Sequence, residues 1–278
     1  MVIANATLAV GPWMVRLSQI SPAASAFWRL ALALPFLFLA ARMAGQTFPR
    51  LGMLWLTLLA AGLFFAADLV AWHSGIQRTK LANATVFGNV ASFFFAAYGF
   101  IVARHLPGRQ QWLAIGMAAM GAGLLLGRSY DLSPRYLTGD LLCLLGGLFY
   151  TGYLVAIDHA RGRVQSWPAL TIATAAGVFP LLVFALLMGP VMPVHWTPLI
   201  LLAMGSQVIG QGLMVYAIGH LSPVVIGIGL LTQPAVGATI GWFAYGERLD
   251  GLDILGMIAI SLAVVLARAG ERQSLAAQ

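Results

Sequence analysis

The chain has 278 residues, of which 60% are hydrophobic and only 8% are charged, and its mean hydropathy is +0.89. About a quarter of the residues of a soluble domain are charged, so this composition excludes an ordinary water-soluble domain. The net charge of +7 does not indicate a nucleic-acid partner, because the basic residues stand singly or in pairs at the ends of apolar runs, where they contact lipid headgroups and set topology.

Ten apolar segments follow one another along the chain, each about as long as the roughly 20 residues that a helix needs to cross a bilayer. We expect spans over residues 2–17, 22–42, 52–74, 81–103, 110–127, 138–157, 167–188, 197–219, 222–245 and 252–267. A polar link over residues 129–135 separates the fifth span from the sixth. The sequence therefore predicts an all-α membrane protein with ten transmembrane helices.

Prolines mark the first and the ninth spans. Pro12 and Pro234 fall inside apolar segments, where a missing backbone N–H bends a helix. Between the eighth and ninth spans, Ser222 is a predicted N-cap and Pro223 fits the first helical position. The first span has no basic residues before it and no clear cleavage site, so we expect no cleavable signal peptide.

The two halves of the chain, residues 1–130 and 136–269, look alike, and residues 270–278 form a polar tail. Each half ends with a span, a tight turn, a span, a polar turn and a last glycine-rich span, and Gly116-Met117 corresponds to Gly256-Met257. Because five spans are an odd number, the second copy enters the membrane from the opposite side. This predicts two inverted five-helix repeats, an architecture of secondary transporters with the substrate site near the midplane.

Basic residues in the links indicate the orientation. On the side of the termini lie eight, Arg42, Arg50, Arg104, Arg109, Arg161, Arg163, Arg268 and Arg272, and on the other side lie six, Arg16, Arg78, Lys80, Arg128, Arg135 and Arg248. The positive-inside rule then favours cytoplasmic N- and C-termini. We expect a multi-pass protein of a bacterial-type inner (plasma) membrane that contacts lipid and is a monomer, since a duplicated chain can form its cavity alone.

Polar side chains within spans are costly in hydrocarbon and face protein or water. Asp68 is the acid that lies well inside a span, and Trp72 shares its face, while His73 points about 100° away. Asp68 and His73 are candidates for proton coupling, because a histidine changes charge near neutral pH. The alternative is that both are satisfied near an interface. For Arg29, we favour snorkelling to the interface over pairing with Asp68 or attracting a carboxylate.

Glutamines and aromatic residues complete the predicted site. Gln207 and Gln211 share a helix face and offer amide groups to the amino and carboxylate groups of a zwitterion, although interhelical hydrogen bonding is an equal alternative. On the fourth span, Thr85 and Asn89 indicate close helix packing, and the neighbouring stripe with Asn83 and Phe87 is a candidate to face a cavity. The predicted substrate-cavity residues are Trp13, Trp72, His73, Asn83, Phe87, Tyr150, Gln207, Gln211 and Tyr216.

Catalytic and metal-binding motifs do not stand out in the sequence. Cys143 is the single cysteine and fits a buried small apolar residue. There is no His-Glu-x-x-His, Gly-x-Ser-x-Gly or phosphate-binding loop. We therefore expect no enzymatic activity, no cofactor and no metal site.

Several of these features resemble the EamA family of the drug/metabolite transporter superfamily. They are the ten spans in two halves, Ser21-Pro22 ahead of Phe27-Trp28-Arg29-Leu30, and Leu221-Ser222-Pro223 followed by Pro234 and Gly246-Glu247-Arg248-Leu249. The first half departs from the family pattern, with His105-Leu106 where Glu-Arg-Leu is common and without the central proline of the fourth span.

The resemblance implies a secondary transporter that exports small metabolites by alternating access, and among the members the aromatic amino acid exporters are the most similar. It also implies a central cavity between two four-helix groups, with the fifth and tenth helices peripheral. The substrate would be a small molecule, amino acids first. The alternatives are a transporter of nucleotide sugars or drugs and, in a different class, a membrane enzyme or scaffold without transport.

Overall fold

The computed structural model describes residues 2–50, 52–91, 94, 98, 108–161, 163–218 and 232–276, and within these it contains helices and connecting turns but no strand. The helices of the first half are α1 (Val2–Leu17), α2 (Pro22–Met43), α3 (Met53–Ile76), α4 (Leu81–Asn89) and α6 (Arg109–Leu132). Those of the second half are α7 (Pro134–Arg161), α8 (Ser166–Met188), α9 (Thr197–Leu201), the π-helix η1 (Leu202–Gln211), α10 (Gly212–Ile218), α12 (Thr232–Tyr245) and α13 (Gly251–Ala276).

Five stretches of helix are long and apolar enough to cross a membrane: Pro22–Met43, Met53–Ile76, Pro134–Ala160, Ser166–Met188 and Thr197–Tyr216. Trp112–Leu125 and Gly251–Ala263 are shorter apolar stretches. The chain is thus a multi-pass helical membrane protein. The predicted fourth and ninth spans run into residues outside the described part, as do Ser222 and Pro223, so the count of ten spans and their inverted arrangement stay predictions.

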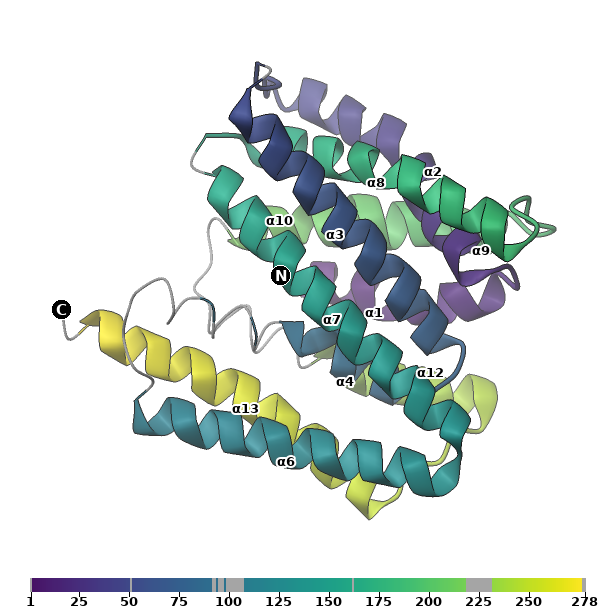
Figure 1. Ribbon diagram of the computed structural model, residues 1–278, viewed down its shortest axis with the longest axis vertical. Helices are drawn as coiled ribbons and strands as arrows, with labels where there is room; N and C mark the ends of the chain where they lie inside the picture. Colours follow the sequence, from purple (N-terminus) through teal and green to yellow (C-terminus); the bar gives the residue numbers. More distant parts are fainter. Residues whose placement is uncertain are drawn as a thin grey trace.

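α3 and α7 lie side by side across the middle of the molecule (Figure 1). α3 lies along both α7 and α8, α2 lies along α8, and α1 lies along η1. α4 and α12 pack on one another. α4 also touches α7, the first helix of the second half, and α12 touches α1, the first helix of the first half. The largest apolar core forms where α2, α3, α7 and α8 meet, around Leu30, Phe65 and Tyr153.

The polar stripe of α4 meets α12 closely, as its sequence indicates. The Thr85 side chain faces Gly237, whose missing side chain leaves room for it. One turn further along α4, the Asn89 amide donates to Gln233 Oε1 at 3.4 Å. The packing interpretation of this stripe is therefore confirmed for these two residues.

α6 and α13 lie side by side along one edge of the molecule (Figure 1). Gly121 allows the close approach, since a Cβ there would lie 2.7 Å from the Gly256 carbonyl oxygen and 2.8 Å from Ile260 Cγ1. These are the fifth and tenth predicted spans, and their position agrees with the peripheral place that the resemblance implies.

Two predicted segments are helical where the sequence indicated polar loops. α6 continues through Leu132 and α7 begins at Pro134, so the expected link over 129–135 is much shorter than predicted. Ser133 makes this possible because its hydroxyl accepts the Arg135 N–H at 3.2 Å, which caps the new helix, and Pro134 fits its first position. Likewise, α13 continues to Ala276, into the predicted tail.

Candidate functional site

Six polar side chains from four helices gather inside the bundle, and we call them the central polar cluster. They are Arg29 from α2, Asp68 from α3, Tyr150 and Tyr153 from α7, and Gln207 and Gln211 from η1. All of these except Tyr150 are buried, and Tyr150 is partly buried. Both halves of the chain therefore contribute to one polar site among apolar helices.

Arg29 is enclosed by protein and does not snorkel. Only 3% of the residue is exposed, and its Nε donates to Gln207 Oε1 at 3.1 Å. Its guanidinium carbon lies 5.8 Å from the centre of the Phe65 ring, within cation–π range. The expected interfacial position is therefore wrong, because η1 presents a buried amide acceptor at the level of Arg29.

Gln207 and Gln211 both bond to neighbouring helices. The Gln207 amide nitrogen donates to Thr174 Oγ1 on α8 at 3.2 Å, while its oxygen accepts from Arg29. Gln211 and Tyr150 bond reciprocally: the phenol donates to Gln211 Oε1 at 3.1 Å and accepts from Gln211 Nε2 at 2.9 Å. The two glutamines thus tie η1 to α2, α7 and α8.

Aromatic rings form one wall of the cluster. The Tyr153 ring stacks on the Phe65 ring with centroids 4.7 Å apart and on the Tyr150 ring at 5.4 Å. The phenol oxygen of Tyr153 is buried without a hydrogen-bond partner. This wall is suited to an apolar or aromatic group of a ligand.

Asp68 faces α7 close to Arg29. Its Oδ1 lies 3.1 Å from the place where a Cβ of Gly146 would be, and it is three residues after Phe65, whose ring centre lies 5.8 Å from the Arg29 guanidinium carbon. In the described part of the chain the only ion pairs within 4.0 Å are Arg16–Glu247 and Lys80–Asp253. Asp68 and Arg29 are therefore near neighbours that do not bond directly.

His73 is fully buried beside α2. Its Nδ1 lies 2.7 Å from Ser25 Oγ, and the Ser25 hydroxyl itself donates to the Pro22 carbonyl oxygen at 2.8 Å. The other ring nitrogen, Nε2, is buried without a hydrogen-bond partner. The role of His73 in proton coupling with Asp68 stays a prediction.

The remaining predicted residues are not members of the central polar cluster, although Trp72 meets Gly146 beside Asp68. Trp13, Trp72 and Phe87 pack in a second apolar core, where the Trp72 indole donates to the Ala84 carbonyl oxygen at 3.1 Å. The Asn83 amide donates to Asp140 Oδ2 at 3.2 Å, and Tyr216 is 52% exposed.

The two predicted bending prolines differ in position. Pro12 lies inside α1. Pro234 lies in the first turn of α12, and residues 219–231, which precede this helix, are outside the described part. Bending at these two positions stays a prediction.

A second polar network, which we call the end network, joins Arg16, Lys80, Glu247 and Asp253 at one end of the bundle. Arg16 bonds to Glu247 Oε1 at 2.6 Å and to the Ile76 carbonyl oxygen at 3.0 Å. Lys80 bonds to Asp253 Oδ2 at 2.5 Å and to the Arg248 carbonyl oxygen at 3.0 Å. The segment between α3 and α4 is thereby tied to α1 and to the segment between α12 and α13.

The Gly246-Glu247 sequence positions the central acid of this network. Gly246 has a φ of +63°, which a glycine adopts readily at the end of a helix, and the Glu247 N–H then donates to the Gly241 carbonyl oxygen at 3.0 Å. The turn directs the carboxylate to α4, where Oε2 accepts the Leu81 N–H at 2.9 Å. Glu247 therefore caps α4 as well as pairing with Arg16.

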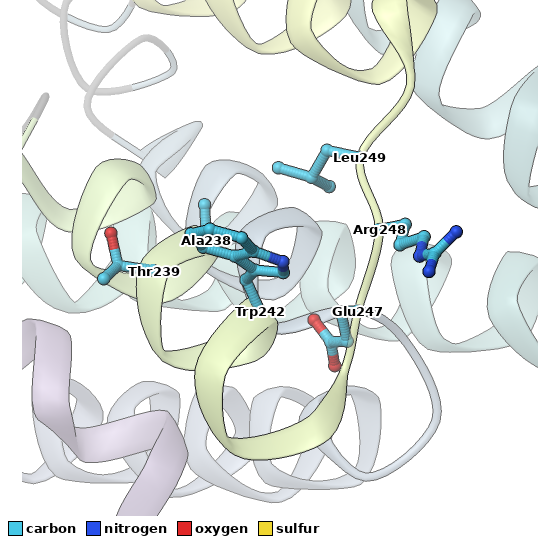
Figure 2. A pocket seen from close by; sticks show the side chains of 6 residues that line it. All are labelled: Ala238, Thr239, Trp242, Glu247, Arg248 and Leu249. Atoms are coloured by element: carbon cyan, nitrogen blue, oxygen red, sulfur yellow. The ribbon is translucent and has the colours of Figure 1, made fainter.

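A pocket of about 560 Å³ lies at the outer side of the end network and is lined by Ala238, Thr239, Trp242, Glu247, Arg248 and Leu249 (Figure 2). Its side chains come from α12 and from the segment that follows it. None of the predicted cavity residues lines this pocket. It belongs to the end of the molecule and not to the central polar cluster.

Three residues of these sites were missed by sequence reasoning. Tyr153 was not among the predicted cavity residues, Arg29 was expected at the interface, and Glu247 was noted only as part of a motif. A usable signal existed for Tyr153, since it lies three residues after Tyr150 and so shares its helix face. For Glu247, none was available, because its partners are 166 and 231 residues away.

Comparison with known proteins identifies relatives over nearly the whole chain. The model of the EamA-like transporter family matches residues 1–127 and residues 137–269. The pseudopaline exporter CntI of Pseudomonas aeruginosa strain UCBPP-PA14 is 26% identical over 272 residues, which cover 95% of this chain and 93% of that protein. An uncharacterized transporter of Archaeoglobus fulgidus is 23% identical, covering 93% of this chain and 92% of that protein.

A solved structure, described only as a protein, has the same fold. It superposes with a TM-score of 0.70 at 16% identity and covers 98% of this chain and 96% of that one. Neither of the named relatives is described as an aromatic amino acid exporter.

Proposed function

Because the chain belongs to the EamA-like transporter family, and is thus a membrane transporter of that type, we propose that it exports amino acids, aromatic ones among them. The observation that carries this proposal is the central polar cluster, in which a buried cation, a buried acid and three stacked rings meet between helices of both halves. Charged groups suit the polar end of an amino acid, and rings suit an aromatic side chain.

The transport mechanism that we propose is alternating access by two inverted repeats. It is supported by the pairing of helices: α3 of the first half packs on α7, and η1, at the corresponding place in the second half, packs on α1. The contact of α4 with α7 is matched in the same way by that of α12 with α1. Such an exchange of partners is expected when two similar halves face each other across a central site.

The proposal extends to the surroundings of the protein. The chain is a monomer in a bacterial-type inner membrane with cytoplasmic termini, and it binds a small molecule without cofactor, metal or catalytic reaction. A second candidate substrate is pseudopaline, favoured by the likeness to the pseudopaline exporter. Nucleotide sugars and drugs are further alternatives, and a membrane enzyme or scaffold without transport is the rival in a different class.

Counterflow in proteoliposomes tests the proposal. Vesicles that contain the purified protein are loaded with one unlabelled amino acid at a time, with pseudopaline or with a nucleotide sugar, and labelled compound is added outside. Transient accumulation of label with aromatic amino acids supports the proposal. If label accumulates only with pseudopaline or with the nucleotide sugar, that compound takes the place of amino acids as the proposed substrate. If folded protein accumulates none of the compounds, the result favours the membrane enzyme or scaffold without transport.

A further inference from the structure

We propose that Arg29 and Asp68 together recognise a zwitterion, with the guanidinium binding the carboxylate of the substrate and the Asp68 carboxylate binding its ammonium group. This inference rests on the proposed transport function and names the groups that define its substrate class. It also reassigns recognition, because the sequence pointed to Gln207 and Gln211 for this role.

Arg29 has binding capacity that the protein does not use. Its Nε bonds to Gln207, but its terminal nitrogen Nη1 is buried without a hydrogen-bond partner. An unsatisfied charged donor in a protein interior is costly, and guanidinium groups favour carboxylates because two N–H groups match two oxygens. The open position on Arg29 is therefore one that a substrate carboxylate would fill.

Asp68 supplies the opposite charge at the same level of the bundle. It is 7% exposed and lies three residues after Phe65 on α3, on the same helix face, while the Arg29 guanidinium lies 5.8 Å from the Phe65 ring. The two charged side chains form no direct ion pair, unlike the two pairs of the end network. A positive and a negative group that are close but not in contact match the separated charges of an α-amino acid.

Gln207 and Gln211 position the Arg29 guanidinium and the aromatic wall, respectively. Gln207 bridges Arg29 to Thr174, so it fixes the guanidinium in place. Gln211 is occupied by the phenol of Tyr150, so it fixes the aromatic wall. Neither glutamine has its whole amide available for a ligand, whereas Arg29 Nη1 and the Tyr153 phenol oxygen are both unpartnered.

Competition for counterflow of labelled phenylalanine tests the inference. The competitors are phenylalanine, 3-phenylpropionate, which lacks the ammonium group, and phenethylamine, which lacks the carboxylate. In the wild-type protein, we expect phenylalanine to compete at least about tenfold better than either analogue, as for the loss of a charged hydrogen bond. If counterflow identifies another amino acid, its own deaminated and decarboxylated analogues take their place.

Variants then assign each charge to its residue. Asp68→Asn should remove the preference over 3-phenylpropionate and keep the preference over phenethylamine, and Arg29→Gln should do the reverse, with Arg29→Lys intermediate. Arg42→Gln on exposed Arg42 of the same helix and Asp158→Asn on exposed Asp158 are the matched controls, and both should retain wild-type selectivity.

The analogue competition and the variants test different parts of the inference. Equal competition by an analogue in the wild-type protein overturns the zwitterion assignment even if no variant folds. Unchanged selectivity in folded Asp68→Asn or Arg29→Gln overturns the residue assignment while leaving amino acid transport intact. Absence of all amino acid counterflow in the wild-type protein instead removes the proposed function, and the inference with it.

Discussion

In the central polar cluster, Gln207 holds other side chains in position and does not itself carry a charge. Its amide joins Arg29 to Thr174, and the neighbouring Gln211 joins η1 to the Tyr150 phenol. These side chains set the position of groups that bind, while Arg29 and Asp68 carry the charges. Buried amides that bond on both sides are typical of interhelical contacts in membranes.

Replacing Tyr150 tests this division. Tyr150→Phe keeps the ring stacked on Tyr153 but removes the reciprocal bond to Gln211. A hydrogen bond of this kind contributes about 0.5–1.5 kcal/mol, so we expect the counterflow rate to fall roughly two- to tenfold in folded protein. Tyr136→Phe on the same helix, at a 37% exposed position, is the control, and equal rates for the two variants would contradict the role of the Gln211 bond.

Glu247 carries a prediction about stability. Glu247→Gln keeps an oxygen for the Leu81 N–H but loses the charge that pairs with Arg16. The two side chains are 14% and 15% exposed, so solvent screens the pair only in part, and we expect a loss of about 1 kcal/mol, or roughly 2–4 °C in melting temperature. Thermal unfolding in detergent measures it, with Asp158→Asn as the control; no difference between the variants would show that the pair does not stabilise this end.

Residue identities predicted part of the site. Gln207, Gln211, Tyr150 and Asp68 stand out because they are polar groups within apolar spans, and the structure brings them together. Arg29 was misplaced because its acceptor, Gln207, is 178 residues away, and no local pattern reveals such a contact. Tyr216 and Trp13 were predicted to line the cavity but are not members of the cluster, because the place of a ring in an apolar span does not say which way it faces.

At the element scale, η1 is the feature that the sequence did not predict. A π-helix is rare and often found at functional sites, and this one extends over the ten residues Leu202–Gln211 that hold both glutamines. Helix existence and most helix bounds were predictable from apolar length and from caps, as at Ser21, whose side chain accepts the Ala24 N–H at 3.2 Å. The wider helical winding of η1 was not, because no local pattern in Leu202–Gln211 indicates it.

Glycine contacts between α3 and α8 allow a test of helix packing. A Cβ at Gly62 would fall on the Ala173 carbonyl oxygen and the Ala176 side chain, so Gly62→Ala must push α3 and α8 apart. Overpacking of this kind costs about 1–3 kcal/mol, and we expect lower thermal stability and slower counterflow.

The matched control for Gly62→Ala is Gly123→Ala in α6. No atom outside its own helix lies within 4 Å of a Cβ at Gly123, and alanine favours a helix more than glycine does. This control should therefore be neutral or slightly stabilising. Equal stability of the two variants would contradict the close contact at Gly62.

At the scale of the whole molecule, the two ends of the bundle differ. The end network holds both ion pairs found in the described part of the chain. At the contact between Gln46, Thr47, Gln165 and Trp167, by contrast, neutral amide groups bond to backbone N–H groups at 3.0 and 3.3 Å. We propose that the end network holds one side of the transporter closed and that transport requires it to open.

The predicted grouping of link residues on one side of the membrane agrees with this arrangement. Arg16, Lys80 and Arg248 were assigned to one side of the membrane from alternation of the spans, and the structure brings them to one end. Sequence alone could group them because successive links between spans lie on alternate sides of the membrane. It did not predict their partners, because Glu247 and Asp253 reach them from the far end of the chain.

Reversible cross-linking of the end network tests the central claim, transport by alternating access, most directly. Cys143 is replaced by alanine, and cysteines are introduced by Lys80→Cys and Arg248→Cys, a pair suited to bridging because Lys80 Nζ bonds to the Arg248 carbonyl oxygen at 3.0 Å. A short bifunctional methanethiosulfonate bridges them, and each single-cysteine variant treated alike is the control. We predict that counterflow stops in bridged protein and returns on reduction, whereas full counterflow in completely bridged protein would contradict alternating access through this end.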